Sequence, residues 1–171
     1  MVYPLIYAGQ RVTAALLTSM LPLESVKLSG TSRASTTTFS DDPDLTLQLE
    51  ANATYAVEMY VHAAAVAAGD IKTIWTVPVG ATGNKAVMGP STAALDGNAD
   101  NITMRSGVHG TSTVVTYNGV RDSSAQFYFF ERATIVTISA GTLALQWAQS
   151  VSSVSSTIVG AGSYIRAKRT A

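Results

Sequence analysis

Two neighbouring stretches decide the fold: Leu45-Thr46-Leu47-Gln48-Leu49-Glu50 and Tyr55-Ala56-Val57-Glu58-Met59-Tyr60-Val61-His62. Along both stretches, apolar side chains alternate with mostly polar ones. Successive side chains of a β-strand point to opposite faces of a sheet, so this period of two predicts strands with one buried face. A third strand is expected from Ile71 to Val77, between the turn at Gly69-Asp70 and the strand breaker Pro78.

The rest of the chain after residue 23 continues this pattern. Strands are expected at 102–105, 112–117, 126–138, 142–150 and 164–169, with turns rich in Gly, Asn, Asp and Ser between them. The interval 79–101 is rich in Gly, Ala, Asn and Pro and is interpreted as a long loop with room for one short strand. Roughly eight or nine short strands separated by such turns predict an all-β fold, an antiparallel, jelly-roll-like β-sandwich.

The segment 126–138 carries aromatic side chains on both of its faces. Phe127 and Phe129 share one face, and Tyr128 and Phe130 share the other. A strand that is apolar on both sides is typical of a central strand or of a surface between subunits. We therefore assign Phe127 and Phe129 to packing in the core or in a trimer.

The two tryptophans receive different predictions. Trp147 alternates in phase with Leu143 and Leu145, which places it in the core, or in trimer packing. Trp75 alternates with Ile74, and this pattern allows the tryptophan to lie on the exposed face. An exposed indole can stack on a sugar ring, so Trp75 is a candidate glycan contact.

The N-terminal region has a different period. From Ala8 to Leu21 apolar residues recur at helical spacing, and Pro22 ends the pattern. A helix of about three turns is too short to be stable alone, so its apolar stripe is expected to lie on the sheet or on a neighbouring subunit. The predicted division is a docking segment with a short α-helix at 1–23 and a β-sandwich at 24–171. The residues expected to dock on such a neighbouring surface are Arg11, Val12, Leu16 and Met20.

The composition excludes several classes of function. Lys and Arg number 11 and Asp and Glu number 11, so the chain lacks the positive field of a nucleic-acid-binding protein. Charged residues are only 13% of the chain, about half of the roughly 25% usual in soluble domains, so the surface offers little electrostatic protection against self-association. Cysteine is absent, so disulfides and thiolate metal sites are excluded. No secretion signal or membrane insertion is expected.

Few residues suit catalysis. His62 is interpreted as an ordinary strand residue, and His109 is expected in a loop, where it is a candidate ligand contact. The acidic run Asp41-Asp42-Pro43-Asp44 resembles a cation site only in its charge, and its proline favours a solvated turn. Common catalytic and nucleotide-binding motifs are absent from the sequence. We therefore expect no enzyme activity, no metal and no cofactor.

Several motifs resemble a family of small structural proteins encoded by phages and prophages of actinobacteria, Streptomyces in particular. The motifs, which span the chain, are Tyr7-Ala8-Gly9-Gln10-Arg11-Val12-Thr13-Ala14-Ala15-Leu16-Leu17, Ala51-Asn52-Ala53-Thr54-Tyr55, Gly69-Asp70-Ile71-Lys72 and Leu143-Ala144-Leu145-Gln146-Trp147-Ala148-Gln149. The aromatic run 127–130 departs from the family pattern.

The resemblance implies a structural component of a virion, since its motifs are structural and contain no catalytic residues. It implies a tail or tail-tip (minor tail) subunit, made in the cytoplasm of the bacterial host, that forms a homotrimer and contacts other phage structural proteins. A capsid decoration or head-fibre protein is the alternative. Contact with host cell-wall glycan through Trp75 and His109 is compatible with both.

Overall fold

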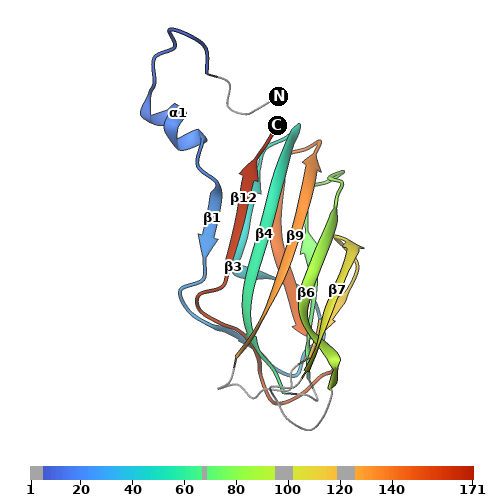
Figure 1. Ribbon diagram of the computed structural model, residues 1–171. Helices are drawn as coiled ribbons and strands as arrows, with labels where there is room; N and C mark the ends of the chain where they lie inside the picture. Colours follow the sequence, from blue (N-terminus) through green and yellow to red (C-terminus); the bar gives the residue numbers. More distant parts are fainter. Residues whose placement is uncertain (1–5, 67–68, 95–101, 119–125) are drawn as a thin grey trace.

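The structure is a computed structural model that describes residues 6–66, 69–94, 102–118 and 126–171 (Figure 1). Within these ranges it contains one helix, α1 (Ala14–Ser19), and twelve strands. The strands are β1 (Leu23–Val26), β2 (Thr31–Arg33), β3 (Ser40–Leu49), β4 (Ala53–Ala64), β5 (Ile71–Thr76), β6 (Asn84–Ala94), β7 (Ile102–Gly110), β8 (Val115–Tyr117), β9 (Phe127–Thr137), β10 (Gly141–Gln149), β11 (Thr157–Val159) and β12 (Tyr164–Arg169).

The strands form two antiparallel sheets, which confirms the predicted β-sandwich. The large sheet has the order β1-β12-β4-β9-β6-β7, and β11 joins it by pairing with both β4 and β2. The small sheet has the order β3-β10-β5-β8. In Figure 1 the large sheet faces the viewer and the small sheet lies behind it.

The strand pairs are nested along the chain. β1 pairs with β12, β2 with β11, β3 with β10, β4 with β9 and β5 with β8, and the hairpin of β6 and β7 lies at the innermost point. The second half of the chain therefore retraces the first half in reverse. This nesting explains why the start of β1 and the end of β12 lie at the same end of the sandwich (Figure 1).

The core follows the predicted alternation. β4 directs Tyr55, Val57, Met59 and Val61 inward, and each is 3% exposed or less. Phe127, Phe129 and Trp147, which were predicted to pack in the core or in a trimer, are all buried within the single chain. On the other face of β9, Tyr128 is 50% exposed and Phe130 is half-buried.

The prediction of a long loop at 79–101 is wrong for residues 84–94. These residues form the long strand β6 (Asn84–Ala94), which pairs with β7 and β9. The small residues that indicated a loop are needed for close packing. A Cβ atom on Gly89 would lie 2.6 Å from Cβ of Phe129 and 2.7 Å from the ring of Tyr117. These two rings stack with centroids 4.0 Å apart. Residues 95–101 lie outside the described part.

The N-terminal helix is shorter than predicted. The helical pattern at 8–21 gives only α1 (Ala14–Ser19), with Thr13 as its N-cap accepting a hydrogen bond from the amide of Leu16 at 3.2 Å. A turn at 7–10, with Gly9 at a φ of 79°, keeps the preceding residues out of the helix. Within the described ranges, no helix is long and apolar enough to cross a membrane.

Candidate functional site

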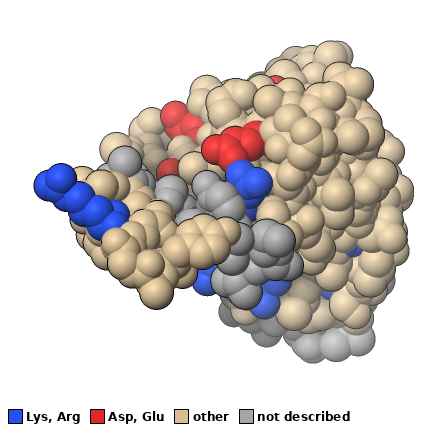
Figure 2. Space-filling model, turned by 90° about the horizontal axis from the view of Figure 1, so that it is seen from above, with Lys and Arg blue, Asp and Glu red and all other residues tan. Residues whose placement is uncertain are grey.

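The N-terminal arm, residues 6–22, lies outside the sandwich. Figure 1 shows α1 beyond one end of the sheets, where it covers neither face of them, and Figure 2 shows the same segment as the lobe on the left. Of the apolar helix side chains that the structure describes, Ala14 and Leu17 are exposed and Leu16 is half-buried, so packing on the chain's own sheet, one of the two predicted alternatives, does not cover this helix. The large apolar side chains of the arm that are exposed are Ile6, Tyr7, Val12, Leu17, Met20 and Leu21.

The residues predicted to dock lie on this arm, although not on one helical stripe. Arg11, Val12 and Met20 are exposed and Leu16 is half-buried. Arg11 and Val12 precede the helix, and Met20 is its C-cap. At the root of the arm, a small hollow of about 100 Å³ separates Leu21 from the side chains of the sandwich. The arm thus carries exposed apolar side chains outside the sandwich.

The outer face of the large sheet carries an aromatic row, defined as Tyr164, Tyr60, Phe130 and Tyr128. Tyr164 of β12, Tyr60 of β4 and Phe130 of β9 are direct neighbours in register. The centroid of the Tyr60 ring lies 5.6 Å from that of Tyr164 and 4.9 Å from that of Phe130. The ring centroids of Tyr128 and Phe130 are 5.6 Å apart. The sequence indicated the alternation of each strand, but only strand pairing brings Tyr164 to the other rings.

A row of alternating charges runs beside the aromatic row. Arg166 pairs with Glu24 at 2.6 Å, and Arg132 pairs with Glu58 at 2.8 Å. The hydroxyl of Tyr164 donates a hydrogen bond to Glu58 at 2.5 Å, and this bond raises the pKa of Tyr164. These pairs are partly exposed, so each contributes little to the stability of the fold. Their main effect is to hold the arginine side chains in place on the surface.

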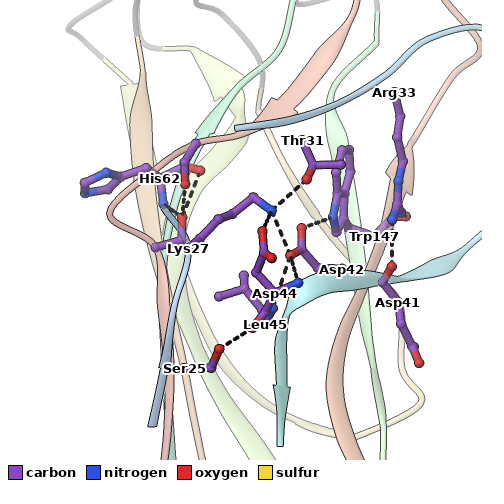
Figure 3. Close-up of polar contacts among 12 residues, drawn as sticks. Ser25, Lys27, Thr31, Arg33, Asp41, Asp42, Asp44, Leu45, His62 and Trp147 are labelled. Atoms are coloured by element: carbon purple, nitrogen blue, oxygen red, sulfur yellow. Dashed lines mark hydrogen bonds and ion pairs between the residues drawn. The ribbon is translucent and has the colours of Figure 1, made fainter. Parts of the chain in front are cut away.

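The acidic run 41–44 is part of strand β3 and not a solvated turn, so that prediction is wrong. Figure 3 shows Asp42 accepting hydrogen bonds from Lys27 Nζ at 3.0 Å and from Trp147 Nε1 at 3.0 Å. Lys27 also pairs with Asp44 at 2.7 Å. The buried lysine supplies the charge that a cation would supply, and no cluster of metal-ligating side chains occurs among the described residues.

A second polar cluster lies between the two sheets, around Glu131 of β9. This carboxylate is fully buried and accepts four hydrogen bonds from side chains of β5, β6 and β8. The donors are Thr73 Oγ1 at 2.6 Å, Trp75 Nε1 at 2.5 Å, Lys85 Nζ at 2.9 Å and the hydroxyl of Tyr117 at 2.9 Å. Burial and the neighbouring carboxylate raise the pKa of Tyr117 well above the usual tyrosine range.

This cluster corrects the prediction for Trp75. The side chain is 4% exposed, because β5 turns Thr73 and Trp75 inward toward Glu131. A buried indole that donates to a buried carboxylate cannot stack on a sugar. The candidate glycan contact at Trp75 is therefore wrong.

Tryptophan fluorescence provides a check on this correction. Since both Trp75 and Trp147 are buried, we expect a blue-shifted emission and weak quenching by iodide in the folded protein. Unfolding in guanidinium chloride should shift the emission to the red and make both indoles accessible to iodide. Strong quenching of half of the native emission would contradict the buried position of Trp75, and the Trp75→Phe variant would identify the residue responsible.

His109 is on a strand and not in a loop. It lies in β7 opposite Lys85 of β6, so its side chain is on the inward side of the large sheet, where it is half-buried. The outer face, which carries the aromatic row, is the other side of this sheet. His109 therefore does not join the exposed aromatic side chains in one site.

Comparison of the chain with protein-family models, with curated proteins and with solved structures finds no match. The geometry itself offers two exposed features, the N-terminal arm and the outer face of the large sheet. The buried carboxylates Asp42 and Glu131 each bind donors of their own chain, which accounts for their place in the interior.

Proposed function

We propose that the chain is a structural subunit of a bacteriophage particle, located at the tail or tail tip, and that it has no catalytic activity. The observation that carries this proposal is the N-terminal arm, with large apolar side chains exposed beyond the sandwich. Exposed apolar groups of this kind mark a surface that binds another protein. The arm is the attachment segment, and the sandwich points outward from the particle.

The proposal includes a jelly-roll topology for the sandwich. In a jelly roll, a long antiparallel hairpin curls so that successive strand pairs fall in opposite sheets. The nested pairs support this arrangement, because β1·β12 and β4·β9 belong to the large sheet whereas β3·β10 and β5·β8 belong to the small one. Jelly rolls are a frequent architecture of viral capsid domains and lectins.

The proposal also includes a homotrimer. Figure 2 shows a surface on which charged side chains are sparse, and the chain has equal numbers of both signs. Such a surface resists association weakly. Light scattering coupled to size-exclusion chromatography should give a mass three times the 17.8 kDa of one chain. A monomer at micromolar concentration would contradict the trimer.

Deletion of the arm tests the attachment. A chain that begins at Leu23 keeps β1 and the buried Lys27, so we expect it to fold with an unchanged circular dichroism spectrum and melting temperature. The same chain should be absent from particles purified from infected cells. A matched variant with Val12→Ser, Leu17→Ser and Met20→Ser should show the same loss. Incorporation of the shortened chain at the wild-type level would remove the arm from the attachment role.

The alternative location, a decoration or head fibre on the capsid, uses the same arm. Immunogold labelling of intact particles in the electron microscope distinguishes the two. We expect gold at the tail, and gold on the heads would replace the tail proposal with the capsid one.

A further inference from the structure

The outer face of the large sheet has a hollow beside the aromatic row. Its volume is about 570 Å³. Ligand sites typically have volumes of about 300–1,000 Å³. Outward-facing Ala56 and Ala86 form its floor, and because their side chains are small the surface is lower there than over the aromatic rings. Asn84, Val108 and Thr134 lie on its sides.

The rim of this hollow is basic. Arg132, Arg166 and Lys168 lie on it, against the single carboxylate of Glu58. The two arginines have acidic partners on the same face. Lys168 is exposed and has no ion-pair partner among the residues that the structure describes. The hollow thus presents more positive than negative charge, on a chain whose overall charge is zero.

The basic rim and the aromatic row are continuous. The guanidinium of Arg132 lies 5.5 Å from the centre of the Phe130 ring, and that of Arg166 lies 5.4 Å from the centre of the Tyr164 ring. A second hollow of about 260 Å³, lined by Ala86, Met88, Phe130 and Arg132, extends toward the rings. An extended ligand can therefore contact the cations and the aromatic side chains together.

We propose that this face binds an acidic polysaccharide. Carboxylate or sulfate groups of the chain bind in the hollow to Arg132, Arg166 and Lys168, since charge-assisted hydrogen bonds to these groups are strong and directional. The apolar faces of the sugar rings lie on the aromatic row, where the tyrosine hydroxyls bind sugar hydroxyl groups. This inference rests on the proposed function, because it gives the outward-facing sandwich a ligand at the host surface.

Titration calorimetry with the purified full-length protein tests the proposal. The probes are polygalacturonate and dextran sulfate as acidic polysaccharides, unmodified dextran as the neutral match, and polyglutamate as an acidic polymer without sugar rings. We expect binding of at least one acidic polysaccharide, weakening as the salt concentration rises. Lys168→Gln and Tyr128→Ala should each weaken that binding about tenfold, which corresponds to about 1.4 kcal/mol.

Both residues are exposed, so the variants should fold, and circular dichroism verifies this. Lys72→Gln on β5 of the small sheet is the matched control and should bind as the wild type does. Equal binding of dextran would contradict the role of charge, and equal binding of polyglutamate would assign the face to acidic peptides. A change from oligomer to monomer in Tyr128→Ala would mean that a second copy covers the face. Each of these results, or the absence of binding, overturns the proposal without affecting the incorporation test of the arm.

Discussion

Replacing Lys85 with methionine is expected to lower the free energy of unfolding by about 3–5 kcal/mol, the usual cost of removing one member of a buried ion pair. Lys85 and Glu131 are both fully buried, with Nζ and Oε2 2.9 Å apart. Methionine replaces the apolar stem of the lysine side chain but not its ammonium group, so the carboxylate of Glu131 loses its charged partner in the interior. The change is measured by urea denaturation followed by circular dichroism.

A double variant separates the unpaired charge from the loss of packing. In Lys85→Met with Glu131→Gln, the amide oxygen accepts from Trp75 Nε1, and the amide nitrogen donates to the hydroxyls of Thr73 and Tyr117, which also act as acceptors. No charge remains, and each polar group retains a partner. The double variant should therefore be more stable than Lys85→Met alone. Equal stability of the two variants would show that the charge of Glu131 is not the cause of the loss.

The alternation of apolar residues predicts strands well where the core is made of hydrocarbon. The stretches around Leu45, Val57 and Leu145 form strands and bury the predicted face. A shift of one residue would turn their apolar side chains to the solvent, so the alternation determines which face is buried. The same reasoning assigned Phe129 and Trp147 to the core or to a trimer, and both are buried within the chain. The alternation does not predict strand order, because nested pairing joins segments that are far apart in the sequence and leaves no local signal.

Residue type misleads where a charge is buried. Glu131 is in phase with the buried Phe127 and Phe129, although a carboxylate is typical of an exposed position, and Asp42 lies in a run typical of a turn. Each is buried because partners from distant segments reach it, Lys85 for Glu131 and Lys27 for Asp42. The inward direction of Trp75 follows from the same cause, since its indole is a donor to Glu131. A single sequence does not record such partners.

The candidate site was predictable in part. The alternation of 126–138 identified Tyr128 and Phe130 as a second apolar face, and that of 55–62 placed Tyr60 outside the core. Joining them to Tyr164 and to the cations of β12 requires the register of β12 on β4. Small residues mislead the prediction. Ala86 and Gly89 of β6 are typical of a loop, yet Ala86 forms part of the floor of the hollow and Gly89 leaves space for the rings of Phe129 and Tyr117.

Alkaline pH is expected to destabilise the protein through Tyr117. Its pKa is raised in the folded state by burial and by Glu131, so the folded protein keeps the hydroxyl proton at a pH at which the unfolded chain loses it. The stabilisation is fully present below the ordinary tyrosine pKa of about 10 and is lost as the pH rises above it. The free energy of unfolding should fall by about 1.4 kcal/mol for each further pH unit from this residue alone.

The Tyr117→Phe variant isolates this contribution. Phenylalanine keeps the stacking on Phe129 and removes the hydrogen bond to Glu131, which should lower the stability at neutral pH by about 1.5–3 kcal/mol. Above pH 10 its stability should fall less steeply than that of the wild type, so the two curves approach each other. Tyr128→Phe, on the exposed face, should follow the wild-type slope. If Tyr117→Phe kept the full wild-type slope, the alkaline loss would have to come from other groups, and the hydroxyl of Tyr117 would not be held in its protonated form by the buried carboxylate.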